Sequence, residues 1–166
     1  MKLIPLTQGY VTKVDDEDYE WLTEWKWYAG TRAGEKNKKV RVVRSINFSN
    51  KIVQVQMPRE IMRARSHEIV DHINGDTMDN QKNNLRLCSL YQNSLNRGLN
   101  RNNKTGYKCV TFRPSKKTNQ YASYIRLNKK LVHLGFFDTA EKAARAYNEA
   151  AKKNFGEFAK LNVIPG

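Results

Sequence analysis

The sequence has little cysteine, no long apolar run and, over 58 consecutive residues, no acidic residue. The two cysteines, Cys88 and Cys109, lack Cys-x-x-Cys spacing, so a four-cysteine zinc site is excluded and a disulfide framework is not indicated. No apolar run approaches the ~20 residues of a membrane span, and the N-terminus shows no signal-peptide pattern. We therefore expect a soluble, intracellular, cytoplasmic protein with free thiols.

The acidic residues are unevenly distributed along a strongly basic chain. The formal net charge is +14, from 30 Lys and Arg against 16 Asp and Glu among 166 residues. Residues 80–137 contain twelve Lys or Arg and no Asp or Glu. A solvated basic face is the simpler explanation, but so long an acid-free stretch favours a polyanionic partner, above all nucleic acid. An anionic membrane is the less common alternative.

Residues 1–60 are expected to form short strands and turns around a tryptophan cluster. Three tryptophans fall within seven residues, at Trp21, Trp25 and Trp27. The spacing of the first two suits one helical turn, with Asp15 or Asp16 as a candidate cap. Such a cluster could stack on nucleic-acid bases, but it is more often the core of a small subdomain.

The residues that point to a chemical reaction lie between positions 69 and 98. Residues 69–72 are predicted to form a strand, followed by a turn at Asn74–Asp76 and a returning strand at residues 84–88. A helix is expected to follow over residues 90–96. An acid and a histidine stand side by side at the end of the first strand.

Phosphodiester hydrolysis requires a deprotonated water, neutralisation of the phosphate charge and stabilisation of the leaving oxygen. Asp71 and the amide oxygen of Asn93 can supply two oxygen ligands to Mg²⁺, which retains positions for water and phosphate. His72 has a reference pKa of about 6.5 and can accept a proton at neutral pH. Asn84 is placed to hold the turn or to orient the His72 ring.

Residues 106–162 are predicted to form a second unit, a three-stranded antiparallel sheet packed on one helix. Three stretches alternate with period two, and apolar residues then recur at helical spacing up to Phe155. Asp138 and Glu141 are expected to form a capping box at the start of the helix. The helix covers one sheet face, and the open face carries Arg113, Tyr124, Arg126 and His133.

The stretch around Asp71 and His72 resembles the HNH homing-endonuclease family, which has a ββα-metal fold. The matching residues are Val70–Asp76, Asp79–Asn80, Asn83–Arg86 and Gln92–Arg97. The resemblance implies that Asp71 and Asn93 bind one divalent metal, Mg²⁺ or Mn²⁺. It further implies that His72 activates water and that Asn84 supports the loop. The alternative is an Asx-rich turn without catalysis.

The second unit resembles the APETALA-type (ethylene-response-factor) DNA-binding domain. The matching segments are Tyr124–Arg126, Leu134–Phe137, Thr139–Ala144, Ala146–Tyr147 and Phe155–Glu157. That family lays its sheet in the major groove, and its contacts map to Lys108, Thr111, Arg113, Tyr124, Arg126, Leu131 and His133. Arginine can bind guanine bidentately. The basic residues Arg97, Arg101 and Lys104 near and within the intervening segment can follow a phosphate backbone.

Together these patterns predict an α+β protein: an N-terminal β-rich region with a ββα-metal nuclease motif, a linker, and a three-stranded antiparallel sheet packed on one helix. The expected nuclease region spans residues 1–98, with its motif at 69–98. A basic linker follows at 99–105, and the DNA-binding domain spans 106–162.

The expected function is that of a site-specific DNA endonuclease of the HNH homing type, phage- or intron-encoded, leaving 5′-phosphate and 3′-hydroxyl ends. The expected partner is double-stranded DNA, which the protein is expected to bind as a monomer. No interaction with a membrane is expected. One active site per chain favours a nick unless the protein dimerises or acts twice. A non-catalytic, sequence-specific DNA-binding regulator is the alternative, and an RNA-binding protein is a third possibility. The set of Asp71, His72 and Asn93 favours the nuclease.

Overall fold

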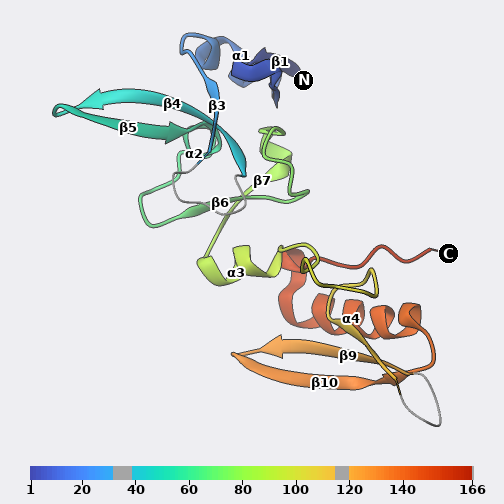
Figure 1. The fold of residues 1–166 in the computed structure, drawn as a ribbon. Helices are drawn as coiled ribbons and strands as arrows, with labels where there is room; N and C mark the ends of the chain where they lie inside the picture. Colours follow the sequence, from blue (N-terminus) through green and yellow to red (C-terminus); the bar gives the residue numbers. More distant parts are fainter. Residues whose placement is uncertain (32–38, 115–119, 166) are drawn as a thin grey trace. The chain divides into compact units, whose positions relative to one another are not determined.

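A computed structural model describes residues 1–31, 39–114 and 120–165, and the chain divides into two compact units, Met1–Leu90 and Tyr91–Gly166. The described residues form several small antiparallel sheets and few helices (Figure 1). The predicted α+β class is therefore confirmed, including the three-stranded sheet packed on a C-terminal helix. The domain boundaries at residues 98 and 106 stay predictions from the sequence.

The elements of the first unit are, in chain order, β1 (Lys2–Pro5), η1 (Thr7–Gly9), β2 (Val11–Val14), α1 (Asp16–Thr23), β3 (Tyr28–Thr31), β4 (Val40–Phe48), β5 (Lys51–Gln56), α2 (Met57–Ile61), β6 (Ile69–His72), η2 (Lys82–Asn84) and β7 (Leu85–Cys88). The strands β1 and β2 pair with each other, β4 lies between β3 and β5, and β6 pairs with β7. The helix α3 (Leu90–Leu95) follows at once, so the predicted order strand, strand, helix is present.

The N-terminal strands and the predicted nuclease motif both contribute to a hydrophobic core among the described residues of the first unit. Leu22 and Met57 are fully buried, and Trp27 is 3% exposed. Leu85 of β7 belongs to the same cluster, and Val70 of β6 packs against it. Because burial of apolar area stabilises the fold, residues 1–60 and the motif are held together by the same core.

The tryptophan cluster is mainly a core feature, as the sequence predicts. The indole of Trp27 is buried, and its Nε1 donates a hydrogen bond to the carbonyl of Leu22 at 2.8 Å. Trp21 is partly buried against the core. Trp25 is 48% exposed, and the guanidinium of Arg44 lies 4.2 Å from its ring centroid.

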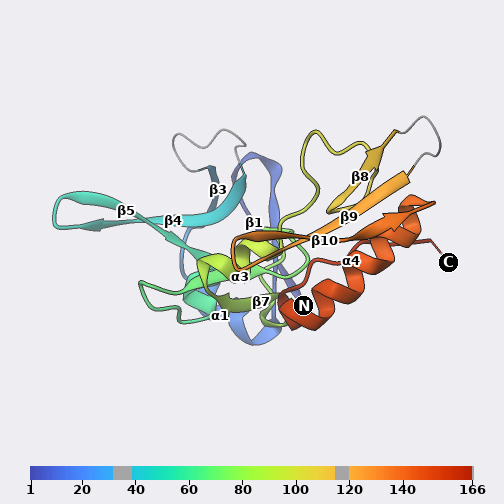
Figure 2. The same ribbon diagram turned by 90° about the horizontal axis from the view of Figure 1, so that it is seen from below.

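The elements of the second unit after α3 are β8 (Val110–Arg113), β9 (Gln120–Leu127), β10 (Lys130–Phe137), α4 (Ala140–Phe155) and η3 (Gly156–Phe158). The sheet is antiparallel, with β9 between β8 and β10, and α4 runs along one of its faces (Figures 1 and 2). Ala143, Ala144 and Ala151 are fully buried. Their small side chains let α4 approach the sheet closely.

The start of α4 differs from the predicted capping box. The N-cap is Thr139, whose Oγ1 accepts a hydrogen bond from the backbone N–H of Lys142 at 3.2 Å. Asp138 forms an ion pair with the ammonium of Lys142 at 2.7 Å. A threonine directly before the first helical turn has the better position for capping, so Asp138 is left outside the helix.

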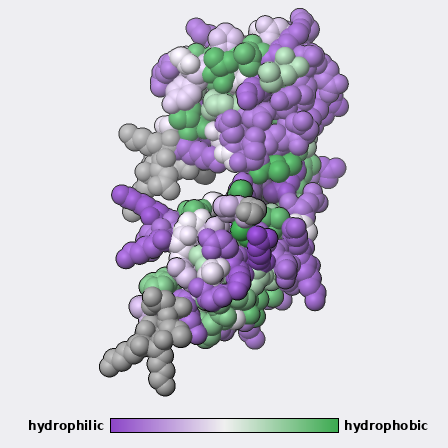
Figure 3. Space-filling model, turned by 90° about the vertical axis from the view of Figure 1, so that its right-hand side faces the viewer, coloured by the Kyte–Doolittle hydropathy of each residue, from purple (hydrophilic) through white to green (hydrophobic). Residues whose placement is uncertain are grey.

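The surface is consistent with a strongly charged chain. The side of the molecule drawn in Figure 3 is largely hydrophilic, and apolar residues appear there only in small patches. Among the described residues, no helix is long and apolar enough to cross a membrane.

The core assignment of Trp27 can be tested by substitution. Trp27→Ala is expected to lower the free energy of unfolding of the first unit by about 3–5 kcal/mol, because a packed indole is lost. Trp25→Ala is the control and should cost about 1 kcal/mol or less. All three tryptophans lie in this unit, so their fluorescence during urea unfolding reports on it alone. Equal losses in the two variants would contradict the assignment.

Candidate active site

The site is built on the hairpin formed by β6 and β7. In this hairpin Asp71 lies opposite Arg86, and His72 lies opposite Leu85. The strand β6 ends at His72, and the backbone N–H of Gly75 donates to the carbonyl of His72 at 3.0 Å. Gly75 has a φ of +86°, which a glycine adopts without strain. The turn predicted at Asn74–Asp76 is therefore present.

Asp71 is buried and is held by an arginine of the paired strand. Only 7% of the residue is exposed, and its Oδ2 accepts two hydrogen bonds from Arg86, one from Nε at 3.1 Å and one from Nη2 at 2.8 Å. Both side chains are about nine-tenths buried. The pair neutralises a carboxylate that would otherwise be costly to bury. Sequence reasoning missed this partner, because the pairing depends on the strand register.

His72 is half-buried, and its Nε2 lies 3.1 Å from Oδ1 of Asn80. Burial lowers the pKa of His72 below its ordinary value, because desolvation disfavours the imidazolium ion. The hydrogen bond to Asn80 acts on the pKa in the opposite direction. The neutral imidazole, which is the form able to accept a proton, is thus favoured at neutral pH.

Asn84 holds the loop between the two strands. Its Oδ1 accepts a hydrogen bond from the backbone N–H of Asn74 at 3.0 Å, and its Nδ2 donates to the carbonyl of Asp79 at 2.8 Å. Of the two roles considered for Asn84 from the sequence, these contacts correspond to holding the loop. The His72 ring instead forms a hydrogen bond with the amide oxygen of Asn80, which the sequence did not single out for this role.

The strand β2 supports the same loop from the N-terminal side. The backbone N–H of Lys13 donates to the carbonyl of Met78 at 2.8 Å, and the N–H of Asn80 donates to the carbonyl of Lys13 at 2.9 Å. The hydroxyl of Thr77 also donates to the carbonyl of Val40 at 2.6 Å. These bonds give the N-terminal strands a direct part in shaping the site.

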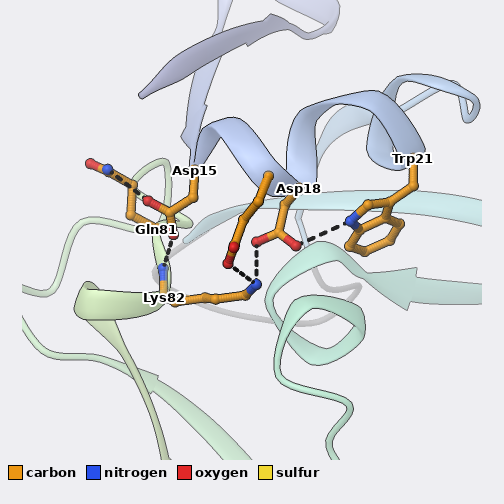
Figure 4. A network of polar contacts seen from close by, with 6 residues as sticks. Asp15, Asp18, Trp21, Gln81 and Lys82 are labelled. Atoms are coloured by element: carbon orange, nitrogen blue, oxygen red, sulfur yellow. Dashed lines mark hydrogen bonds and ion pairs between the residues drawn. The ribbon is translucent and has the colours of Figure 1, made fainter.

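A second set of polar contacts ties α1 to the residues before β7 (Figure 4). Asp15 stands at the N-cap of α1 but makes no side-chain cap bond. Its carboxylate instead accepts hydrogen bonds from the backbone N–H of Lys82 at 2.7 Å and from Gln81 at 3.1 Å. The ammonium of Lys82 pairs with Asp18 at 3.0 Å and with Glu17. The loop is therefore anchored at both of its ends.

The donors available for a divalent metal are few and are oxygen atoms. No group of three His, Cys, Asp or Glu side chains able to hold a metal occurs in the part of the chain that the structure describes. A carboxylate has about four lone-pair sites, so Asp71 can accept its bonds from Arg86 and still ligate a hard cation. The other predicted ligand, Asn93, lies on α3 in the second unit, and its role stays a prediction.

The open face of the second unit's sheet brings together three of the residues predicted to bind DNA. The rings of Tyr124 and His133, which are cross-strand partners, have centroids 5.1 Å apart. A guanidinium nitrogen of Arg113 lies 3.4 Å from the Tyr124 hydroxyl. Arg126 is exposed on the same strand as Tyr124, and Thr111 is exposed on β8. This face combines cationic and aromatic side chains.

The basic residues before β8 differ in their surroundings. Arg97, Arg101 and Lys104 are exposed. The ammonium of Lys108 donates to the carbonyl of Arg97 at 2.7 Å and also to that of Leu95. Burial lowers the pKa of Lys108. Its ammonium group is hydrogen-bonded to backbone carbonyls at and just after the C-terminal end of α3. Its predicted contact with DNA stays a prediction.

The buried pair of Asp71 and Arg86 should be important for stability. Arg86→Ala is expected to lower the free energy of unfolding of the first unit by about 3–5 kcal/mol, because it leaves a buried carboxylate without its partner. Glu20→Ala is the control, since it breaks an exposed pair with Lys2 and should cost about 1 kcal/mol or less. Urea unfolding followed by tryptophan fluorescence measures both. A loss below 1 kcal/mol for Arg86→Ala would contradict the buried pair.

Comparisons with known proteins give two partial similarities. No model of a known protein family matches the chain, and no solved structure matches it. An uncharacterised HNH endonuclease of Acanthamoeba polyphaga mimivirus is 28% identical over 144 residues, covering 86% of this chain and 70% of that protein. An AP2-like ethylene-responsive transcription factor of Arabidopsis thaliana is 42% identical over 66 residues, covering 40% of this chain and 13% of that protein. The first similarity suggests a nuclease.

Proposed function

We propose that this protein is a metal-dependent DNA endonuclease of the HNH type. The observation that carries the proposal is the end of β6, where a buried carboxylate and a histidine of lowered pKa stand side by side. Each is fixed by its own partner, Asp71 by Arg86 and His72 by Asn80. Such fixed groups are what a hydrolytic site needs, since little reorganisation is then required during the reaction.

In the proposed reaction His72 acts as the general base. It accepts a proton from a water molecule, and the water oxygen forms a new bond to phosphorus. The bond between phosphorus and the 3′ oxygen breaks, and the departing oxygen takes up a proton from solvent. The products carry a 5′-phosphate and a 3′-hydroxyl.

Asp71 and Asn93 would hold one divalent cation, Mg²⁺ or Mn²⁺. The set of hard oxygen donors suits these ions. When bound, the cation would supply charge neutralisation at the phosphate and stabilise the leaving oxygen. Arg86 keeps the Asp71 carboxylate in one orientation, and Asn84 holds the loop between β6 and β7 through its bonds to Asn74 and Asp79.

The second unit would bring double-stranded DNA to this site. The cationic and aromatic open face of the sheet supports this role, as does the run of residues 80–137 without an acid. Arg113 and Arg126 are the candidates for contacts to base edges. The exposed Arg97, Arg101 and Lys104 are candidates for phosphate contacts.

A non-catalytic DNA-binding regulator is the second candidate function. The observation that favours it is the similarity to an AP2-like transcription factor over 66 residues. A regulator would use the open sheet face but would have no need for a neutral histidine beside a buried carboxylate. Cleavage of duplex DNA separates the two functions.

The catalytic role of His72 predicts a specific loss of activity. His72→Ala should retain duplex binding and lose about 10²–10⁴-fold in the rate of Mg²⁺-dependent cleavage, which is the usual contribution of a general base. His67→Ala is the matched control, because His67 is exposed and lies outside the site. End-labelled duplex fragments on a denaturing gel measure the rate. Undiminished cleavage by His72→Ala would overturn the catalytic assignment.

The DNA-binding role of the sheet predicts a different loss. Arg126→Ala in the full chain should weaken duplex binding about tenfold to a hundredfold, as expected for loss of a base-edge contact. Lys153→Ala is the control, since this exposed lysine lies in the last turn of α4. Fluorescence anisotropy over a range of salt concentrations measures both. Equal affinities for the two variants would exclude Arg126 from the interface.

A further inference from the structure

Asn80 is a polar residue with no exposed surface, and its side chain makes contacts at both ends. Its Oδ1 lies 3.1 Å from Nε2 of His72. Its Nδ2 lies 2.8 Å from the hydroxyl of Thr12 and 3.3 Å from the carbonyl of Thr77. A carboxamide has separate acceptor and donor ends. Because buried polar groups are nearly always hydrogen-bonded, the direction of this amide is determined by its neighbours.

Thr12 determines that direction. This fully buried threonine has one hydroxyl proton, which it donates to the carbonyl of Met78 at 2.8 Å. The hydroxyl oxygen can therefore only accept a hydrogen bond from Asn80. The carbonyl of Thr77 is likewise an acceptor, so the NH₂ end of the amide must face these two oxygens. The reversed amide would place an oxygen against two acceptors, at a cost of about 1–3 kcal/mol for each group left unpaired.

We propose that Thr12 and Asn80 are positioning residues that hold His72 in the tautomer with its proton on Nε2. With the NH₂ end of Asn80 directed to Thr12, Oδ1 faces the ring and accepts from Nε2. A neutral imidazole has one N–H, so Nδ1 is the nitrogen that receives the proton from water. The last step rests on the proposed nuclease function, whereas the tautomer follows from the hydrogen bonds alone.

β2 would then contribute to the reaction through its hydrogen bonds to the loop that carries Asn80. The chain of bonds runs from the Met78 carbonyl through Thr12 and Asn80 to His72. Its effect is to keep one ring nitrogen in the acceptor state and the ring in one orientation. Groups that orient a functional histidine in this way commonly change activity by about 10–100-fold when they are removed.

The test uses the full chain and two substitutions at one position. Thr12→Val removes the hydroxyl while keeping the shape of the side chain, and Thr12→Ser keeps the hydroxyl. The ring nitrogens are observed by NMR in protein labelled with ¹⁵N-histidine, at a pH of about 8, where an ordinary histidine is neutral. The chain has three histidines, His67, His72 and His133, and the spectrum of His72→Ala assigns the signals.

We expect the Nε2–H tautomer of His72 in the wild type and in Thr12→Ser. Thr12→Val should show a substantial population of the Nδ1–H tautomer, because the shorter of the two hydrogen bonds that fix the direction of the Asn80 amide is then lost and only the bond of 3.3 Å to the Thr77 carbonyl remains. The rate of duplex cleavage should fall about 10–100-fold in Thr12→Val with duplex affinity unchanged, and Thr12→Ser should retain the wild-type rate. Recovery by serine is a result that a loss of packing alone would not give.

Two results would overturn the inference. The first is an Nδ1–H tautomer in the wild type, which needs no variant and stands even if Thr12→Val does not fold. The second is undiminished cleavage by Thr12→Val at wild-type affinity. A wild-type chain that shows the Nε2–H tautomer but cleaves no duplex would instead support the hydrogen-bond arrangement and overturn the proposed function.

Discussion

The proposed site depends on the hydrogen bonds that the buried carboxamide of Asn80 forms. The loop over residues 73–84 joins two short strands, and fixing its backbone costs conformational entropy of about 1–2 kcal/mol per residue. Asn80 offsets part of this cost by bonding at once to β2, to its own loop and to His72. Asn84 and Asp15 add bonds at the two ends of the loop. The N-terminal residues are thus structural parts of the site.

Adjacent residues at the end of β6 are held by different parts of the unit. Asp71 is bonded to Arg86 of the paired strand, whereas His72 is bonded to Asn80 of the loop. Neighbouring side chains on a strand point to opposite faces, so one partner could not have fixed both. The separate partners fix a carboxylate and an imidazole on adjacent residues, and these are the two groups that the proposed hydrolysis uses.

The sequence was sufficient for local patterns and insufficient for contacts that depend on register or on distant residues. Alternation predicted the sheet of the second unit, because exposed and helix-facing positions differ in polarity, and the Asn-Gly turn after β6 is equally local. The pairing of Asp71 with Arg86 requires the strand register. The bond between Asn80 and Thr12 joins residues 68 positions apart, and no sequence pattern marks it. At α4 the expected cap was one residue early, because Asp138 and Thr139 are both good caps and only the backbone geometry decides between them.

If the chain hydrolyses duplex DNA, the ends that it produces will show it most clearly. A pool of random-sequence duplexes would be incubated with the purified chain and Mg²⁺ or Mn²⁺, and the new ends captured by ligation and sequenced. We expect metal-dependent breaks at a defined sequence, with 5′-phosphate and 3′-hydroxyl ends that ligase can join. Binding to the same duplexes without a break under either metal would contradict it.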